Sequence, residues 1–244
     1  MMESASIFIL LAVFAVAFLY SSVGHAGASG YIAVLALAGF APDVIKPTAL
    51  VLNILVASIG AFLFWRAGHF QWKLFWPFAL MAAPMAYLGG YLNLPAHLFK
   101  ILVGAVLLLS AARFLFRQGD PAVVKPPPVP LALGAGAGLG LLSGLTGTGG
   151  GIFLTPLLLF CRWARTKNVA ATSALFILVN SSTGLLGFLT SGKSIPSFTW
   201  TFAVFAITGG LFGSWLGSQK FPVRTIQLLL AAVLLLAGSK LIWS

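Results

Sequence analysis

The chain has 244 residues, of which 60% are hydrophobic and only 7% are charged, and its mean hydropathy is +1.05. Soluble domains carry about 25% charged residues, so this composition excludes a soluble globular protein and indicates a polytopic membrane protein. The net charge is +11, from 14 Lys and Arg against 3 Asp and Glu. The basic residues are scattered singly between apolar segments, which excludes a nucleic-acid-binding patch and fits contact with lipid headgroups.

Ten apolar segments succeed one another along the chain, and most approach the roughly 20 residues that a transmembrane helix needs. They are residues 4–20, 28–41, 47–65, 72–92, 98–116, 129–144, 150–161, 169–190, 197–217 and 222–243. A polar, proline-rich stretch separates the first five segments from the last five. We therefore predict a first repeat over 1–117, a cytoplasmic linker over 118–128 and a second repeat over 129–244.

Two glycine-rich motifs support the division into repeats. SSVGHAGASG over 21–30 and GLTGTGGGIF over 144–153 each separate two apolar segments. A shift of 122 residues lays one motif over the other, with Gly27 on Gly149. A shift of 124 residues aligns the next segments of the two halves without gaps, including Thr48 with Thr172. We therefore expect each repeat to begin with a short helical hairpin around its glycine motif and to continue with three transmembrane helices.

The distribution of positive charge indicates how the repeats are oriented. Five segments per half is an odd number, so the second half would enter the membrane upside down. The loops on one side would then hold ten basic residues and those on the other side four, whereas a parallel arrangement gives seven and seven. Only the first arrangement has a positive-inside bias. The sequence therefore predicts an all-α fold of two inverted repeats in the cell inner (plasma) membrane, with both termini outside the cytoplasm.

The glycine motifs have the features of an anion site. Transporters with inverted repeats place broken helices near the middle of the membrane, at the interface between the repeats. A helix that starts after a glycine turn points free N–H groups and its positive dipole end into that region, which suits an anion. The alternative is that the glycines only permit a tight turn and close packing. The candidate substrate-binding residues in the motifs are Ser22, His25, Gly27, Ser29, Thr146, Thr148, Gly149 and Gly150.

Polar residues in the segments after each hairpin complete the candidate site. Asn53 lies in one such segment, and Thr172 and Asn180 lie in its counterpart. Polar side chains at this depth either bond neighbouring helices or face the transport pathway, and a buried amide needs several partners. A separate series of small residues, Gly136, Gly140 and Gly144, has the spacing of close helix packing.

The remaining chemistry-bearing residues exclude most enzymes. The only acids are Glu3, Asp43 and Asp120, all in predicted loops or termini, and the only cysteine is Cys161. Because the sequence shows no cluster of His, Asp, Glu or Cys inside the membrane, we expect no catalytic site, no metal and no cofactor. His25 is the only motif residue that titrates near neutral pH.

The ordered set of motifs resembles the TauE/SafE sulfite exporter family. It includes SGLTGTGGGIFLTPLLL and NVAATSALFILVNSSTG in the second half and GHAGASGYIAVLAL and KPTALVLNILVASIGAF in the first. The resemblance implies a secondary transporter of small sulfur-containing anions: sulfite, thiosulfate or an organosulfonate such as sulfoacetate. We expect export, with the anion held at the midplane by the two hairpins. An anion channel or facilitator and an intramembrane enzyme are the alternatives, and the sequence leaves the oligomeric state open.

Overall fold

The computed structural model describes residues 2–22, 25–115, 124–217 and 223–243, and every regular element in these ranges is a helix. This confirms the predicted all-α fold of a polytopic membrane protein. The helices are α1 Met2–Ser22, α2 Ala28–Leu37, α3 Pro42–Arg66, α4 Trp72–Tyr91, α5 Ala96–Leu115, α6 Val129–Thr146, α7 Gly151–Phe160, α8 Thr166–Thr190, α9 Thr199–Gly217 and α10 Val223–Trp243.

Three helices of the described chain, α3, α6 and α8, are long and apolar enough to cross a membrane. By contrast α2 and α7 have 10 residues each, and at 1.5 Å per residue they extend only about 15 Å. A hydrocarbon core is about 30 Å thick, so neither short helix crosses it alone. Each of these short helices comes after a longer one, α1 or α6, so the hairpins have one long arm and one short arm.

The two halves repeat the same series of elements. Helices α3 and α8 have 25 residues each, and their positions differ by 124 residues, as expected. For the hairpins the predicted shift of 122 is wrong by one residue. The left-handed glycine that precedes α2 is Gly27, with φ 93°, and the one that precedes α7 is Gly150, with φ 77°. The shift that relates the two hairpins in the structure is therefore 123 residues. The residue at which each short helix begins sets the alignment of the hairpins, and the run of glycines does not.

The halves interlock through glycine-lined contacts between helices. Helix α6 packs against α4 and α1 packs against α9, so the long arm of each hairpin lies on a helix of the other half. A methyl group added at Gly136, Gly140 or Gly144 of α6 would collide with backbone carbonyl groups of α4. This confirms the predicted small-residue packing.

At the centre, α3 packs against α8, which brings together the two helices that carry the candidate asparagines.

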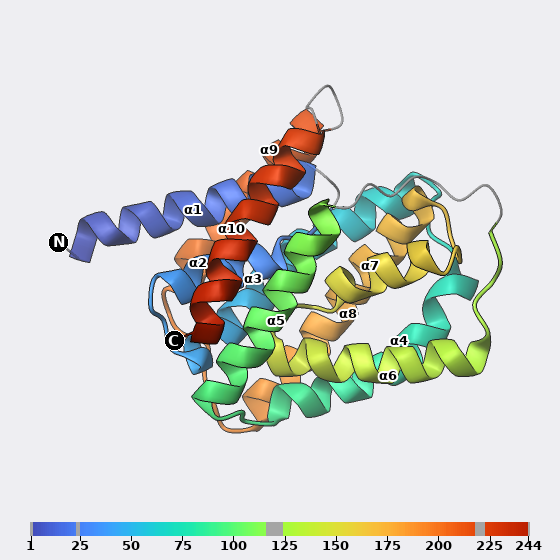
Figure 1. Ribbon diagram of the computed structural model, residues 1–244, viewed down its shortest axis with the longest axis horizontal. Helices are drawn as coiled ribbons and strands as arrows, with labels where there is room; N and C mark the ends of the chain where they lie inside the picture. Colours follow the sequence, from blue (N-terminus) through green and yellow to red (C-terminus); the bar gives the residue numbers. More distant parts are fainter. Residues whose placement is uncertain (1, 23–24, 116–123, 218–222, 244) are drawn as a thin grey trace.

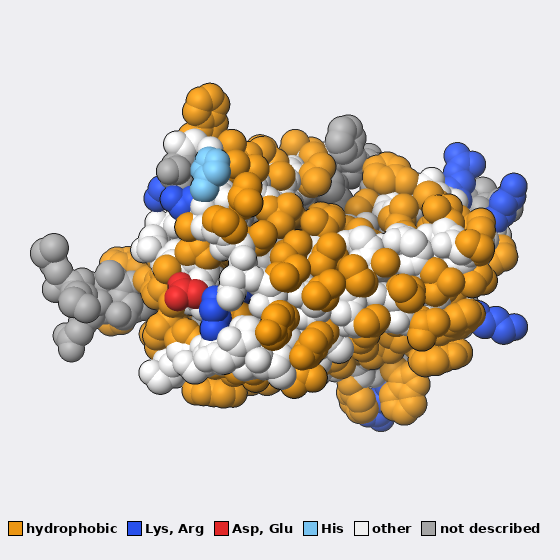
Figure 2. All heavy atoms as spheres, turned by 90° about the horizontal axis from the view of Figure 1, so that it is seen from below, with side chains coloured by type: hydrophobic (Ala, Val, Ile, Leu, Met, Phe, Trp, Pro, Cys, Tyr) orange, Lys and Arg blue, Asp and Glu red, His pale blue; other side chains and the backbone are white. Residues whose placement is uncertain are grey.

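The ribbon and the surface are consistent with a membrane-embedded molecule. In Figure 1, α1 begins toward the left, where α10 also ends, whereas α6 begins at the right. Figure 2 shows a broad hydrophobic surface on one face, with Lys and Arg side chains gathered toward its two ends. Most of the predicted linker lies outside the described residues, but the Lys125 amide donates to the carbonyl of Arg162, 3.1 Å away. This bond joins the start of the second half to the loop between α7 and α8.

Candidate functional site

The turn before α7, residues 147–150, is here called the second tip. Gly147, Gly149 and Gly150 all have positive φ, between 72° and 80°, a backbone conformation that L side chains rarely adopt. No side chain caps the start of α7. The first intrahelical bonds run from the amides of Phe153 and Leu154 to the carbonyl of Gly150, at 3.1 Å each. Helix geometry therefore leaves the amides of Gly151 and Ile152 without an intrahelical acceptor, at the positive end of the helix.

Two amide side chains and a hydroxyl surround the second tip. A methyl group at Gly150 would lie 3.1 Å from Asn180 Nδ2, and one at Gly149 would lie 3.3 Å from Asn53 Nδ2 and 2.9 Å from Ser181 Oγ. Asn53 Nδ2 donates to the carbonyl of Gly147 at 3.2 Å, which ties α3 to the tip. The structure therefore places both predicted asparagines, one from each half, against the same turn.

Most of the polar atoms around this turn have no partner in the described structure. Asn53, Asn180 and Ser181 are fully buried. The unpartnered atoms are Asn53 Oδ1, Asn180 Nδ2 and Oδ1, Ser143 Oγ and Ser181 Oγ. A buried polar group without a hydrogen bond costs about 1–3 kcal/mol. Such a concentration of unsatisfied groups next to a helix N-terminus is typical of a site that takes up a polar ligand.

The two threonines of the second tip bond each other. Thr146 Oγ1 donates to the carbonyl of Leu142 at 2.7 Å and lies 3.0 Å from Thr148 Oγ1. Because the Thr146 proton is used on Leu142, Thr148 is the donor between the two hydroxyls. Both hydroxyl protons are thus taken up inside the turn. The structure gives these predicted site residues a role in holding the turn closed.

The turn before α2, of which residues 25–27 are described, is here called the first tip. A methyl group at Gly27 would lie 3.0 Å from the Tyr31 ring, so the side chain of α2's own first turn covers this tip. Ser29 is buried, and its hydroxyl lies 2.8 Å from Tyr20 Oη. The Tyr31 hydroxyl is fully buried and has no partner within the described chain. The left-handed glycine before the helix is the same as at the second tip, but the phenol of Tyr31 stands where the asparagine amides stand at the second tip.

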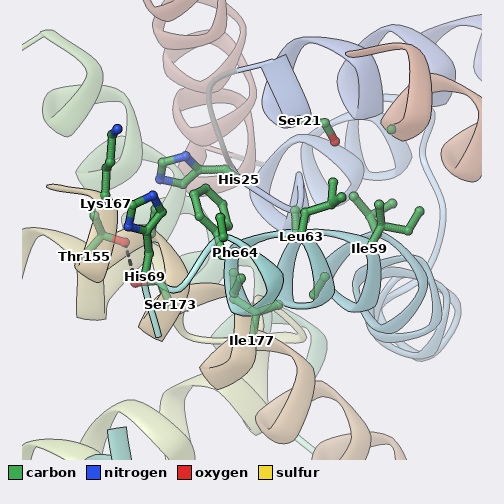
Figure 3. Close-up of a pocket in the computed structure, with 18 residues that line it drawn as sticks. Ser21, His25, Ile59, Leu63, Phe64, His69, Thr155, Lys167, Ser173 and Ile177 are labelled. Carbon is green, nitrogen blue, oxygen red and sulfur yellow. Dashed lines mark hydrogen bonds between the residues drawn. The ribbon is translucent and has the colours of Figure 1, made fainter. Parts of the chain in front are cut away.

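A cavity of about 350 Å³ begins at the first tip and ends at Ile177, next to the second tip, and we call it the tip cavity (Figure 3). His25 and Ala26 of the first tip line it, and so does Ile177, whose side chain would collide with a methyl group at Gly149. His69 and Lys167 also line it; in Figure 3 their side chains and that of His25 project toward the same end. Thr155 and Ser173 share a hydrogen bond of 2.8 Å on its wall. Ile177 therefore separates the open space from the second tip.

A smaller hollow of about 20 Å³ lies between the tips. Gly27 of the first tip and Ser29 of α2 line it on one side, and Thr148 of the second tip lines it on the other. A space of this volume has room for about one water molecule. The hollow therefore has residues of both glycine motifs in its lining.

Two predicted residues are not placed at the tips. Thr172 is buried in α8 with an unpartnered hydroxyl, but it lies eight residues before Asn180, about 12 Å along the helix. The side chain of Ser22 lies outside the described residues. Conversely, the structure places four residues at the tips or in the tip cavity that are absent from the sequence-based prediction. They are Ser143, Ser181, Tyr31 and His69. Ser143 and Ser181 stand in or beside the quoted motifs, and only the fold shows which motif positions face the tip.

The described residues contain no group of three or more His, Cys, Asp or Glu side chains close enough to hold a metal ion. The groups at the tips are backbone amides, side-chain amides and hydroxyls, together with the imidazole of His25 at the first tip.

Comparison with known proteins identifies the family. The model of the family described as "Sulfite exporter TauE/SafE" matches residues 9–241. The "Probable membrane transporter protein y4hK" of Sinorhizobium fredii (strain NBRC 101917 / NGR234) is 40% identical over 249 aligned residues, which cover 99% of this chain and 100% of the relative. No solved structure matches. With nearly its whole length matched, the chain belongs to the TauE/SafE sulfite exporter family of membrane proteins.

Proposed function

We propose that this membrane transporter carries a small sulfur-containing anion, such as sulfite, thiosulfate or an organosulfonate, and that the anion binds at the second tip. The observation that carries the proposal is Asn180. Its amide is fully buried, both of its polar atoms lack a partner in the described structure, and its Nδ2 faces Gly150 at the start of α7. A purely structural asparagine at this depth would be expected to satisfy at least one of these atoms.

The donors at the second tip suit an oxyanion. The first-turn amides of α7 and the Nδ2 group of Asn180 are all hydrogen-bond donors, and the helix dipole adds a positive potential. A sulfite or sulfonate group offers three oxygen acceptors around one sulfur, so it can bond several of these donors at once. Sulfur in the substrate is an expectation from the family, whose description names sulfite.

The size of the tip cavity is compatible with such a substrate. At about 350 Å³ it holds a small anion together with several waters, each of which occupies about 30 Å³ in the liquid. The basic groups His69 and Lys167 at one end would raise the local concentration of anions. The substrate would then pass Ile177 to reach the second tip.

We propose export as the direction of transport. An inside-negative potential favours outward movement of an anion by about 2.3 kcal/mol per charge per 100 mV. Import would have to work against this term and would need coupled cations. The chain has only three acids, Glu3, Asp43 and Asp120, and the one whose side chain is described, Asp43, lies in the first turn of α3. Asp43 is exposed, so the described residues offer no buried carboxylate that could carry a coupling cation.

We also propose that the repeats are inverted, with the linker in the cytoplasm and both termini outside. The ten-to-four distribution of basic residues supports this orientation, and so do the opposite starting ends of α1 and α6 in Figure 1. Reporter fusions test it. A fusion after Trp243 should be active outside the cytoplasm and one near Lys125 inside it; a cytoplasmic C-terminus contradicts the proposal.

Flux measurements in proteoliposomes test the function itself. Purified protein is reconstituted, and efflux of sulfite, thiosulfate, sulfoacetate, taurine, sulfate and phosphate is measured with and without an imposed membrane potential. We expect saturable flux of one or more of the sulfur-containing anions and little flux of phosphate. Flux that rises linearly with concentration would favour the alternative, an anion channel. Absence of flux for every anion in the panel would contradict the proposed function.

A further inference from the structure

A second cavity, of about 210 Å³, lies on the other side of the second tip, where α3 begins, α4 ends and the α8–α9 loop passes. Its lining includes Lys46, Lys193, Asp43, Phe188, Asn93 and Leu145. We call it the lysine vestibule. We infer that it is a second binding station for a small oxyanion, through which the anion passes between the second tip and the aqueous side. The inference rests on the proposed function for the identity of the anion, but not for the existence of the site.

The first support is an uncompensated positive charge. Lys46 is only 6% exposed, and its Nζ donates to the carbonyls of Gly89, Gly90 and Leu92 at 2.8, 2.9 and 3.2 Å. These neutral acceptors at the end of α4 hold the ammonium in place without cancelling its charge. Within the described ranges, neither Lys46 nor Lys193 forms a salt bridge. Lys46 therefore acts as a fixed positive charge in the wall of the cavity.

Lys193 supplies the donors that Lys46 lacks. Its Nζ lies 5.4 Å from the centre of the Phe188 ring, and Lys46 Nζ lies 5.9 Å from the same ring. Two ammonium groups thus line one cavity, that of Lys46 from α3 and that of Lys193 from the α8–α9 loop. Among the described residues, the only carboxylate in the lining is that of Asp43. Because like charges repel, this arrangement is stabilised when an anion lies between them. Lys193 stands in a loop and can turn its three N–H groups to such an anion.

The second support is that the lysine vestibule recurs in the other half of the molecule. The shift of 124 residues that relates α3 to α8 also relates lining residues of the tip cavity to lining residues of the vestibule. Phe64 corresponds to Phe188, His69 to Lys193, Lys167 to Asp43 and Ala170 to Lys46. Because four repeat-related positions line a cavity in both places, the cavities result from the repeated arrangement of α3 and α8 and not from local imperfect packing. The two cavities are therefore repeat-related approaches to the tips.

The third support is contact with the second tip. A methyl group at Gly147 would lie 3.1 Å from the backbone oxygen of Lys46, so the tip rests directly on the lysine that lines the vestibule. Leu145, two residues before that glycine, lines the cavity. The carbonyl of Gly147 accepts the bond from Asn53 Nδ2. One turn of backbone therefore separates the vestibule from the proposed substrate site, and an anion that leaves the tip on this side enters between the lysines.

The inference is tested without transport, by cysteine labelling. Asn93 lines the vestibule and is exposed, and Cys161 is the only native cysteine. The Asn93→Cys variant is made in a Cys161→Ser background, purified in detergent, and reacted with an anionic sulfonatoethyl and a cationic trimethylammonioethyl methanethiosulfonate. Replacing Lys193 by Gln should lower the ratio of anionic to cationic labelling rates by about tenfold, since one unit charge near the thiol affects both reagents in opposite senses. Lys100→Gln, which removes a charge from a neighbouring cavity, should leave the ratio within about twofold.

Occupancy by an anion is read from protection. Sodium sulfate and sodium methanesulfonate, which do not react with the labelling reagents, should slow anionic labelling of Asn93→Cys relative to sodium chloride at equal ionic strength, and Lys193→Gln should abolish the difference. A cysteine at Ser197, exposed in the same loop but outside the vestibule, should show no protection. Equal labelling with and without the oxyanions, or protection that survives Lys193→Gln, would overturn the inference.

The outcome for the vestibule is separable from the outcome for the proposed function. If oxyanions protect the cysteine but the protein transports none of the anions across liposome membranes, the proposed function is contradicted and the inference about the vestibule is supported. The same experiment distinguishes a free oxyanion from a phospholipid headgroup. A headgroup retained by the purified protein would slow labelling of the cysteine before any salt is added, whereas a free oxyanion slows labelling only after its salt is added.

Discussion

The two tips use the same backbone device but have different surroundings. Each places a glycine with positive φ before a helix of 10 residues that no side chain caps. At the first tip the hydroxyl end of the Tyr31 ring lies against Gly27, so a phenol covers the glycine. At the second tip the amides of Asn53 and Asn180 lie against Gly149 and Gly150. The repeated backbone thus supplies two helix N-termini of the same kind. The side chains of α2, α3 and α8 determine which of the two N-termini is surrounded by polar groups.

This difference assigns unequal roles to the tips. Five unsatisfied polar atoms gather around the second tip, on Asn53, Asn180, Ser143 and Ser181, whereas among the described residues the first glycine motif and the start of α2 have two, Ser21 Oγ and the Tyr31 hydroxyl. Ser29 and Tyr20 bond each other. We therefore expect the second tip to provide most of the binding free energy for the anion and the first tip to shape the opposite wall.

The largest effect is expected from a leucine at the second tip. In Gly149→Leu, the new side chain would meet Ile177 and Ser181 at a backbone conformation that disfavours any L residue. We expect anion flux to fall at least about 100-fold, because a displacement of about 1 Å at a site of fixed geometry is sufficient for a loss of that size. Gly134→Leu on the exposed face of α6, where an added methyl group meets nothing within 4 Å, is the control. Normal flux from well-inserted Gly149→Leu would show that the second tip is a packing feature.

A loss of about 10- to 100-fold in transport is expected for Asn180→Ala, since a hydrogen bond to a charged ligand is worth about 1.5–3 kcal/mol. The stability of the ligand-free protein should stay the same or rise, because the variant removes two buried atoms that have no partner in the described structure. Asn53→Ala differs in breaking the bond to Gly147 and should lower stability by about 1 kcal/mol. Flux and thermal unfolding of both variants check this contrast. If Asn180→Ala instead destabilises the protein and transports normally, the asparagine is structural.

A smaller change is expected at the first tip. Tyr31→Phe removes a buried hydroxyl that has no partner among the described residues and keeps the ring over Gly27. The apparent KM for the anion should rise by about threefold to tenfold with little change in stability, which corresponds to a single hydrogen bond of about 1 kcal/mol. A loss of transport as large as that of Asn180→Ala would reverse the order of the two tips.

The smallest effect on transport is expected from Thr148→Val. The Thr148 hydroxyl donates its proton to Thr146 inside the turn, so it has none left for the substrate. Stability should fall by about 1 kcal/mol while flux per folded molecule stays within about threefold of the native protein. A tenfold or greater loss of flux without loss of stability would place Thr148 in direct contact with the anion.

The sequence is sufficient to predict the helices and part of the site. Hydropathy and the glycine motifs indicate where helices begin and end, and the buried positions of Asn53 and Asn180 are expected for amides placed within long apolar segments. The spacing of Gly136, Gly140 and Gly144 correctly predicts close packing on another helix, although not that the partner is α4 of the other half. Local patterns specify which face packs, but the partner depends on the whole fold.

Other features depend on three-dimensional contact that no spacing reveals. The register of the hairpins is ambiguous by one residue in the sequence, because several glycines in a row fit equally well until a helix start selects one. The cover of Tyr31 over Gly27 and the bonds from Lys46 to the end of α4 join residues whose roles are set by the packing of neighbouring helices. The pairing of the Thr146 and Thr148 hydroxyls is equally hidden in the sequence, because a hydroxyl in a turn can serve the ligand or the backbone equally well.

The central claim is that an oxyanion binds at the start of α7 between Asn53 and Asn180. Crystals of the Cys161→Ser protein soaked in selenite, with anomalous diffraction recorded at the selenium edge, test it most directly; the substitution prevents reaction of selenite with the thiol. We predict an anomalous peak within hydrogen-bonding distance of Asn180 Nδ2 and the amides of Gly151 and Ile152, and its disappearance in Asn180→Ala. No peak at the second tip, with selenium found only elsewhere, would contradict the claim.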